Sequence, residues 1–166
     1  VNWSNDGETL SNFKGSNIRN RSYHFKEGIT WSTTSGSAFA GRKSPTGYLF
    51  DSKGCMAFSY GGISLEKLLA QMNAVTFNSF LDIITPTLDF NPGPVGNVPI
   101  EEVNNNVSEE LVIENISASK DDWDSFENSW DFKKHPLLRN ISTISEAFAQ
   151  WQAECDDRFN KLKANE

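Results

Sequence analysis

The periodicity of the apolar residues changes near residue 61, and this change constrains the fold more than any other feature of the sequence. From residue 23 to residue 60, short apolar or β-branched runs alternate with Gly, Ser and Pro, a pattern typical of strands joined by loops. From Leu65 onward, apolar residues recur at i, i+3, i+4 and i+7, the spacing of an amphipathic helix. The sequence therefore predicts an α+β fold, in which a small β-rich sheet-and-loop body is followed by helices.

The predicted strands are four short runs, each bounded by turn-forming residues. The connection after the second run contains Ser-Pro-Thr-Gly and the connection after the third contains Ser-Lys-Gly, so both are expected to be turns or loops. Basic residues lie beside these connections. We expect the strands at residues 28–32, 38–42, 48–51 and 55–59.

The first predicted helix has both a start and a stop signal. Ser64 is placed as its N-cap, and Glu66 lies in its first turn. The helix should end at or before Thr85, because Pro86 disfavours helical dihedral angles in the residue before it. Residues 87–100 contain several Pro and Gly residues, and we expect an ordered but irregular crossing there.

Two further helices are predicted in the last third of the chain. Residues 103–118 have one apolar and one acidic side, and a final helix should run from Thr143, with Glu146 completing a capping box, to about Ala164. Between them, residues 121–138 are aromatic and acidic, and we expect them to fold over the core. The final helix carries an apolar stripe that is expected to pack inward, the alternative being an exposed seam. The stripe consists of Ile144, Phe148, Trp151, Cys155, Phe159 and Leu162.

The length, 166 residues, suffices for one domain or for a compact piece of a larger protein. The chain begins with neither a start methionine nor a signal peptide, and no apolar run reaches the length of a membrane span, so we expect a cytosolic protein without a membrane partner. We divide it into a poorly assigned segment (1–22), a β-rich body with one amphipathic helix (23–100) and a helical region (101–166).

The charges are distributed unevenly along the chain. The formal net charge is −7, which by itself disfavours nucleic-acid binding. Residues 1–60, however, contain seven Lys or Arg against four Asp or Glu, a balance of +3, whereas residues 61–166 contain eight against eighteen, a balance of −10. This asymmetry indicates one surface suited to a polyanion and another suited to water or a basic neighbour. The alternative is that the charged residues are distributed unevenly by chance and mark no particular surface.

Motifs for catalysis and metal binding are weak in this sequence. It contains no Gly-rich nucleotide loop and no nucleophile elbow, and its two Cys and two His form no zinc-type cluster. The Asp-x-Lys triplets that begin at Asp51 and Asp131 fit the end of a nuclease motif, but a turn contact and an ordinary surface pair explain them better. The acidic run at residues 121–124 lacks the spacing of a calcium loop and is expected to be a solvated helix start.

The residue types between positions 19 and 53 favour recognition of DNA. Arg and Lys on Gly-, Ser- and Thr-rich loops suit contacts to phosphates and to the acceptors of guanine, and hydroxyl groups suit contacts to base edges. Trp31 or Tyr48 would be able to stack on bases or wedge between them. The alternative is that Trp31, Phe39 and Phe50 are simply core residues of a small sheet.

Two of the basic candidates, Arg42 and Lys43, adjoin the Ser-Pro-Thr-Gly turn, and we expect both side chains to be solvated. The sequence does not distinguish the residues that contact bases from those that contact phosphates. The complete set of candidate DNA-binding residues is Arg19, Arg21, Lys26, Thr30, Trp31, Ser32, Ser35, Arg42, Lys43 and Lys53.

Several segments, in the same order along the chain, resemble the C-terminal target-recognition region of PglX-type adenine-specific DNA methyltransferases of BREX phage-defence systems. The resemblance extends from about Tyr23 to the C-terminus, and residues 1–22 contribute little to it. The segments are Phe25–Ser32, Tyr48–Gly54, Pro86–Phe90, Gly96–Ile100, Trp123–Glu127, Ser129–Phe132 and His135–Leu138.

The resemblance implies a role in DNA-sequence recognition, in the manner of the specificity domains of restriction-modification enzymes. In that family an upstream domain binds S-adenosylmethionine and holds the flipped adenine with an Asn-Pro-Pro-Tyr motif. The nearest string here, Asn91-Pro92-Gly93-Pro94, lacks the aromatic residue, so we expect this piece to be catalytically inert and to hold no cofactor. The implied partners are double-stranded DNA, the methyltransferase body that the helical region attaches to, and other BREX proteins in the bacterial cytoplasm.

A protein-interaction module of the same defence system is the rival hypothesis. It would bind its partner through the acidic helical surface, and the balance of −10 in residues 61–166 favours it.

Overall fold

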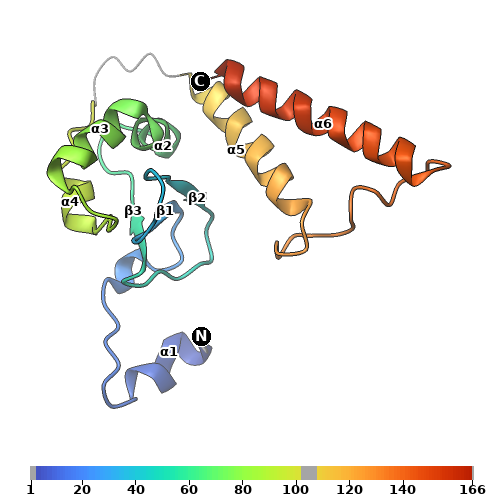
Figure 1. The fold of residues 1–166 in the computed structure, drawn as a ribbon. Helices are drawn as coiled ribbons and strands as arrows, with labels where there is room; N and C mark the ends of the chain where they lie inside the picture. The colour runs from blue at the N-terminus through green and yellow to red at the C-terminus, as the bar shows by residue number, and fades with distance from the viewer. Residues whose placement is uncertain (1–2, 102–107, 166) are drawn as a thin grey trace.

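The computed structural model describes residues 3–101 and 108–165, and these residues form a small antiparallel sheet with helices (Figure 1). The strands β1 (Gly28–Ser32), β2 (Arg42–Ser44) and β3 (Gly54–Ala57) lie in the order β2-β1-β3. The predicted α+β class and the long C-terminal helix are confirmed. The helices are α1 (Ser4–Ser11), the 3₁₀ turn η1 (Arg21–Tyr23), α2 (Leu65–Asn73), α3 (Val75–Ile84), α4 (Pro92–Gly96), α5 (Glu109–Asp124) and α6 (Ile144–Asn165).

Two of the four predicted strands are confirmed and two are wrong. The strand at residues 28–32 is β1, and the strand predicted at residues 55–59 is β3, shifted toward the N-terminus. Residues 38–41 are instead a loop, because side-chain amides of the helices bind its backbone: Phe39 N donates to Asn78 Oδ1 (2.9 Å), and Gly41 N donates to Asn73 Oδ1 (2.8 Å). Residues 48–51 also form a loop, and none of these four residues belongs to a strand.

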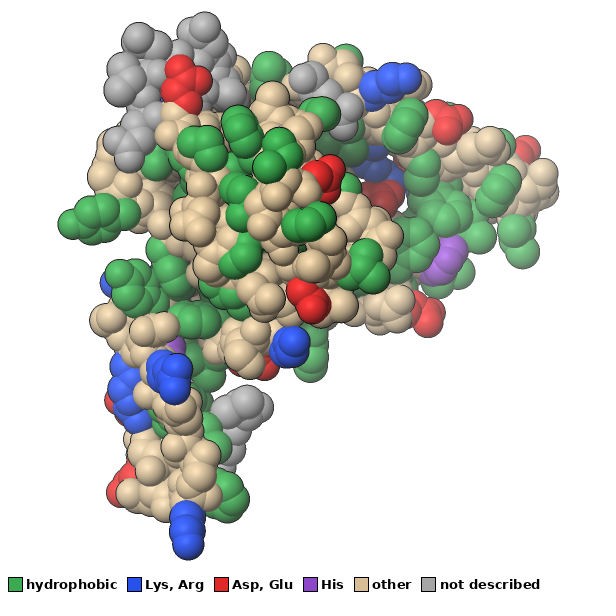
Figure 2. Space-filling view, turned by 60° about the vertical axis from the view of Figure 1, so that its left-hand side comes forward, with side chains coloured by type: hydrophobic (Ala, Val, Ile, Leu, Met, Phe, Trp, Pro, Cys, Tyr) green, Lys and Arg blue, Asp and Glu red, His purple; other side chains and the backbone are tan. Residues whose placement is uncertain are grey.

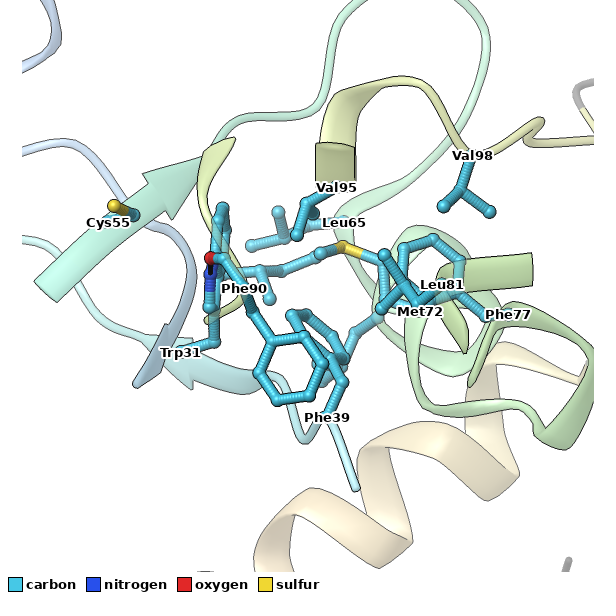
Figure 3. Close-up of a cluster of buried hydrophobic side chains, with 12 residues drawn as sticks. Trp31, Phe39, Cys55, Leu65, Met72, Phe77, Leu81, Phe90, Val95 and Val98 are labelled. Atoms are coloured by element: carbon cyan, nitrogen blue, oxygen red, sulfur yellow. Dashed lines mark hydrogen bonds between the residues drawn. The ribbon is translucent and has the colours of Figure 1, made fainter. Parts of the chain in front are cut away.

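The hydrophobic core lies between the sheet and the helices α2 to α4 (Figure 3). Trp31 points from β1 into this core and its indole Nε1 donates a buried hydrogen bond to the Phe90 carbonyl (2.8 Å). The Phe39 ring packs against Phe77 and Phe90, with centroids 5.4 and 5.5 Å away. The core consists of Ile29, Trp31, Phe39, Cys55, Leu65, Leu69, Met72, Phe77, Leu81, Phe90, Val95 and Val98.

The end signals of the first predicted helix are correct, but the helix is not continuous. Ser64 Oγ accepts from Lys67 N as an N-cap, and helical structure ends before Thr85. At Ala74 the backbone is extended (ψ 150°), which separates α2 from α3 and allows α3 to bury residues of its own in the core. A short helix, α4, also occupies part of the expected irregular crossing. The body at residues 23–100 therefore contains three α-helices rather than one.

Helices α5 and α6 form a hairpin that extends away from the sheet (Figure 1). Glu109 at the start of α5 fastens the hairpin to α2, since it accepts a hydrogen bond from Ser64 Oγ (2.8 Å) and pairs with Lys67 (3.7 Å). Arg139, in the connection between the two helices, forms a bidentate ion pair with Glu154 of α6 (2.6 and 2.8 Å). Polar contacts thus hold much of the hairpin together.

Several expectations for the helical region are wrong. Helix α5 covers residues 109–124 rather than 103–118, and the predicted residues 103–107 lie outside the described part of the chain. The acidic run at residues 121–124 is therefore a helix end, where Lys120 offsets the unfavourable acidic charge by pairing with Asp124. Residues 121–138 do not fold over the core, and Trp130 is 100% exposed.

The apolar stripe of α6 packs inward only in part. Thr143 caps the helix as predicted, since its Oγ1 accepts from Glu146 N. Trp151 is half-buried and its ring contacts those of Phe126 and His135, but other members of the stripe remain exposed to solvent. The exposed members are Ile144, Phe148 and Phe159.

An ion pair joins the edge strand β2 to helix α2. Lys43 Nζ lies 2.6 Å from Glu66 Oε1, and the Lys43 side chain is only 29% exposed. The hydrogen bond from Lys43 lowers the pKa of Glu66 below its ordinary value of 4.5, against a smaller opposing effect of burial. A carboxyl with a lowered pKa in the folded state stabilises the fold above its ordinary pKa and loses this effect as the pH falls.

We predict that Glu66→Gln lowers the free energy of unfolding by about 1 kcal/mol at pH 7, because a charge-assisted hydrogen bond at a partly buried site is weakened. The difference from wild type should shrink as the pH falls from 4.5 through the lowered pKa. Urea unfolding between pH 7 and pH 3 measures both values. Glu27→Gln is the matched control, because Glu27 is mostly exposed and lies 3.8 Å from the same lysine. Equal effects of the two variants would contradict the structural role of Glu66.

We also predict that Trp31→Phe lowers the free energy of unfolding by about 1–3 kcal/mol, because the buried Phe90 carbonyl loses its donor. Trp151→Phe should cost less than about 1 kcal/mol, because Trp151 Nε1 has no hydrogen-bond partner among the described residues. Thermal or urea unfolding of the two variants compares the same chemical change at both sites. Equal losses would mean that the Trp31 hydrogen bond contributes nothing.

Candidate nucleic-acid interface

The sheet has one face that is turned away from the core. On β1, Ile29 and Trp31 point into the core, so Thr30 and Ser32 point to the opposite side. Arg42 of β2 is directly opposite Thr30 and therefore shares its side. This outer sheet face contains no carboxylate. We define it as Thr30, Ser32, Arg42, Ser44 and Met56.

Two polar contacts order this outer sheet face. Thr30 Oγ1 donates to the carbonyl oxygen of Cys55 (3.0 Å), which leaves the hydroxyl oxygen able to accept. Arg42 Nη2 donates to Ser32 Oγ at 3.4 Å, a long contact between neighbouring strands. Arg42 is exposed and makes no ion pair within the described parts of the chain. Its guanidinium therefore remains available to an anion or a base.

The prediction that both Arg42 and Lys43 are solvated is correct only for Arg42. Consecutive residues of a strand point to opposite faces, so Lys43 turns toward the helices. There it pairs with Glu66 and, at 3.8 Å, with Glu27. Lys43 is therefore a structural residue, and we remove it from the candidate set.

Trp31 is also removed from the candidate set. Its side chain is 3% exposed, and its indole N–H already donates to the Phe90 carbonyl, so it cannot stack on a base without unfolding the core. The alternative hypothesis is correct for Trp31 and Phe39, which are core residues, but not for Phe50, which lies outside this core and packs against the rings of His24 and Phe58. Tyr48, which was the other candidate for stacking, is 54% exposed.

The loops beside the sheet carry the candidates Ser35 and Lys53. Asp51 Oδ1 accepts from the backbone N of Lys53 (2.8 Å) and of Gly54 (2.6 Å), and these bonds lower the pKa of the Asp51 carboxyl. This confirms that the first Asp-x-Lys triplet is a turn. The Lys53 side chain is exposed, whereas Ser35 is half-buried with its backbone N bonded to the Leu88 carbonyl. Throughout residues 3–101 and 108–165, no three metal-ligating side chains gather into a site.

The remaining candidates lie on an N-terminal arm formed by residues 12–27. Figure 2 shows several Lys and Arg side chains along this part of the molecule. Arg21 pairs with Asp6 (3.4 Å) and Lys26 lies over the Tyr23 ring (5.3 Å), whereas Arg19 donates from Nε to Asn17. Aromatic contacts such as Tyr23 with Phe58 (4.8 Å between centroids) hold the arm against the sheet body.

The structure therefore sorts most of the surviving candidates into two groups, while Ser35 and Lys53 lie on the loops beside the sheet. Thr30, Ser32 and Arg42 share the outer sheet face, and the arm carries Arg19, Arg21 and Lys26. The sequence-based set missed Ser44, which lies on the same face as Arg42 because the two residues alternate along β2. The alternation rule would have identified it had the bounds of β2 been known.

A charged hollow of about 630 Å³ lies near the tip of the hairpin. Its lining offers no aromatic or large aliphatic side chain on which an adenine ring would stack, so it does not fit a nucleoside cofactor. We assign no cofactor to it. The lining residues are Lys120, Asp121, Asp124, Ser125, Asp131, Lys133, Lys134 and Pro136.

None of the helices in the described residues combines the length and the apolar character required to cross a membrane. No protein-family model matches the chain. Over its whole length the chain is 45% identical to part of the adenine-specific methyltransferase PglX of Lacticaseibacillus casei (strain Zhang), in an alignment of 179 residues. Over 98% of its length it is 36% identical to part of the adenine-specific methyltransferase BrxX of Escherichia coli O9:H4 (strain HS).

The chain spans only 15% of the length of the first relative and 13% of the second. The alignments therefore concern one segment of each of these longer proteins, and that segment aligns with almost all of the present chain. They confirm the similarity to adenine-specific methyltransferases and extend it to residues 1–22, which contribute little to the resemblance noted in the sequence. The chain is homologous to a segment of adenine-specific methyltransferases.

Proposed function

We propose that this chain is the DNA-recognition segment of a bacterial N6-adenine DNA methyltransferase that acts in phage defence. The observation that carries the proposal is the outer sheet face, where an exposed arginine stands among hydroxyl groups and no carboxylate. The homology to methyltransferase segments supplies the context. Methyl transfer and the binding of S-adenosylmethionine belong, in this proposal, to the rest of the enzyme, because this chain spans only 15% and 13% of the two methyltransferase relatives.

In the proposed mechanism, the two groups of candidates perform different tasks. The flexible basic side chains of the arm and Lys53 contact phosphates, which fixes the register of the protein on the duplex. The outer sheet face contacts base edges through Thr30, Ser32 and Arg42, whose hydroxyl and guanidinium groups provide both donors and acceptors. Such a segment would hold the DNA so that the target adenine reaches the catalytic site, without contacting the adenine itself.

The α5–α6 hairpin is proposed to attach this segment to the methyltransferase body. Its surface is acidic, which disfavours DNA, and it exposes large apolar side chains that a soluble monomer would rarely leave uncovered. Trp130 is 100% exposed, and tryptophan is among the residue types that dominate protein interfaces. This observation also favours the second candidate function, a module that binds another protein of the defence system.

We predict that the isolated chain binds duplex DNA weakly and with strong salt dependence. If about four phosphates are neutralised, the affinity should fall roughly 100-fold between 50 and 200 mM salt. Ser32→Glu should weaken binding at least about tenfold, because a carboxylate beside Arg42 would compete with DNA. Fluorescence anisotropy with a labelled duplex measures both effects.

Ser145→Glu is the matched control for this experiment, because it adds the same charge at an exposed position of α6. It should leave DNA binding nearly unchanged. Binding that is insensitive to salt, or equal weakening by both substitutions, would contradict a DNA-binding role for the outer sheet face.

We further predict that the isolated chain self-associates through the exposed side of α6. Phe148→Ser combined with Phe159→Ser should reduce this association and change the melting temperature little, because both side chains are at least half exposed. Trp151→Ala, at a half-buried position, should instead lower the melting temperature. Light scattering and thermal unfolding separate the two effects. A wild-type chain that stays monomeric at high concentration would argue against an adhesive surface on α6.

A further inference from the structure

Arg42 differs from the other arginines in its surroundings. Most of them are engaged by carboxylates, whereas Arg42 and Arg19 make no ion pair among the described residues. Arg19 lies on the irregular arm and its Nε is bound to Asn17, but Arg42 begins a strand of the sheet. A side chain on a regular strand is held in direction better than one on a loop. The paired arginines are Arg21, Arg139 and Arg158.

The immediate neighbours of Arg42 orient its guanidinium and leave most of it free. Ser32 Oγ accepts from one terminal nitrogen at 3.4 Å, and Thr30 is directly opposite Arg42 on β1. A guanidinium has five N–H donors, so this single contact leaves a pair of parallel donors available. The planar pair matches two adjacent acceptors on a phosphate, a carboxylate or a guanine.

The position of Arg42 in the sheet favours the base over the phosphate. Strand β2 is the edge strand of the three-stranded sheet, and with the central strand β1 it forms an antiparallel ribbon that carries Arg42. The major groove of B-form DNA admits such a ribbon and presents guanine N7 and O6 side by side. The exposed lysines that suit phosphates, Lys26 and Lys53, lie outside the strands.

We propose that Arg42 contacts guanine N7 and O6 in the major groove and that Ser32 is its positioning residue, so that this pair sets part of the sequence specificity. This inference rests on the proposed function, because it assigns one specific contact within the DNA-recognition surface. Thr30, opposite Arg42, then faces the neighbouring base pair, where its hydroxyl can accept from an amino group.

The first experiment is a selection from a random pool of 24-base-pair duplexes, followed by sequencing of the DNA bound to the wild-type chain and to variants. The wild type should enrich a G·C pair at one position, and Arg42→Ala should lose this enrichment. A good bidentate contact corresponds to roughly 5- to 150-fold discrimination against another base pair. Arg42→Lys should lose most of the enrichment as well, because an ammonium cannot form the paired contact.

Lys53→Ala is the matched control, because it removes an exposed positive charge outside the strands. It should weaken binding about equally for all sequences and leave the enrichment unchanged. Circular dichroism and thermal unfolding show whether each variant is folded, and the exposure of Arg42 predicts a melting temperature close to that of wild type.

The second experiment uses the enriched duplex with the selected guanine replaced by 7-deazaguanine, which lacks the N7 acceptor. The wild type should lose affinity several-fold, and Arg42→Ala should bind both duplexes equally. The inference is overturned if the wild type shows no enrichment, if Arg42→Ala keeps it, or if Arg42→Ala weakens all sequences to the same extent. Absence of salt-sensitive DNA binding by the wild type would instead overturn the proposed function itself, and this inference with it.

Discussion

The buried hydrogen bond from the Trp31 indole to the Phe90 carbonyl joins the first strand to a segment 59 residues further along the chain. It brings the two sides of the core together, so that residues 87–90 run beside the end of β1, where Phe90 N also donates to the Thr33 carbonyl. With helices α2 to α4 covering this side, the other side of the sheet keeps Ser32 and Arg42 exposed, while Thr30 and Met56 are half-buried there. The candidate interface therefore exists because the core occupies only one face of a three-stranded sheet.

The edge strand β2 shows how two adjacent basic residues acquire different roles. The alternation of side chains along a strand turns Lys43 toward Glu66 of α2 and leaves Arg42 on the open side. Lys43 fastens the strand to the helical layer, and the Arg42 side chain is free to contact a ligand. The chemical type of the two residues is similar, and only the geometry of the strand distinguishes them.

The helical hairpin has a composition that complements the basic first part of the chain. Ion pairs such as that of Arg139 with Glu154 hold its elements together, and few of its apolar side chains are buried. Ala147 is the residue of α6 that is fully enclosed. Exposed apolar side chains of this kind are typical of interaction surfaces, which supports the proposal that the hairpin attaches this segment to a larger protein.

Local signals in the sequence determined β1, the N-caps at Ser64 and Thr143 and the α+β class, because propensity, capping and alternation act within a few residues. The similarity to adenine-specific methyltransferases was also visible in short segments of the sequence. The tertiary structure alone decided the remainder. It placed Trp31 in the core rather than at the surface and turned residues 38–41 into a loop whose backbone is bound by helix side chains. It also exposed the aromatic residues of the hairpin, because burial and hydrogen bonding depend on partners that are distant in sequence.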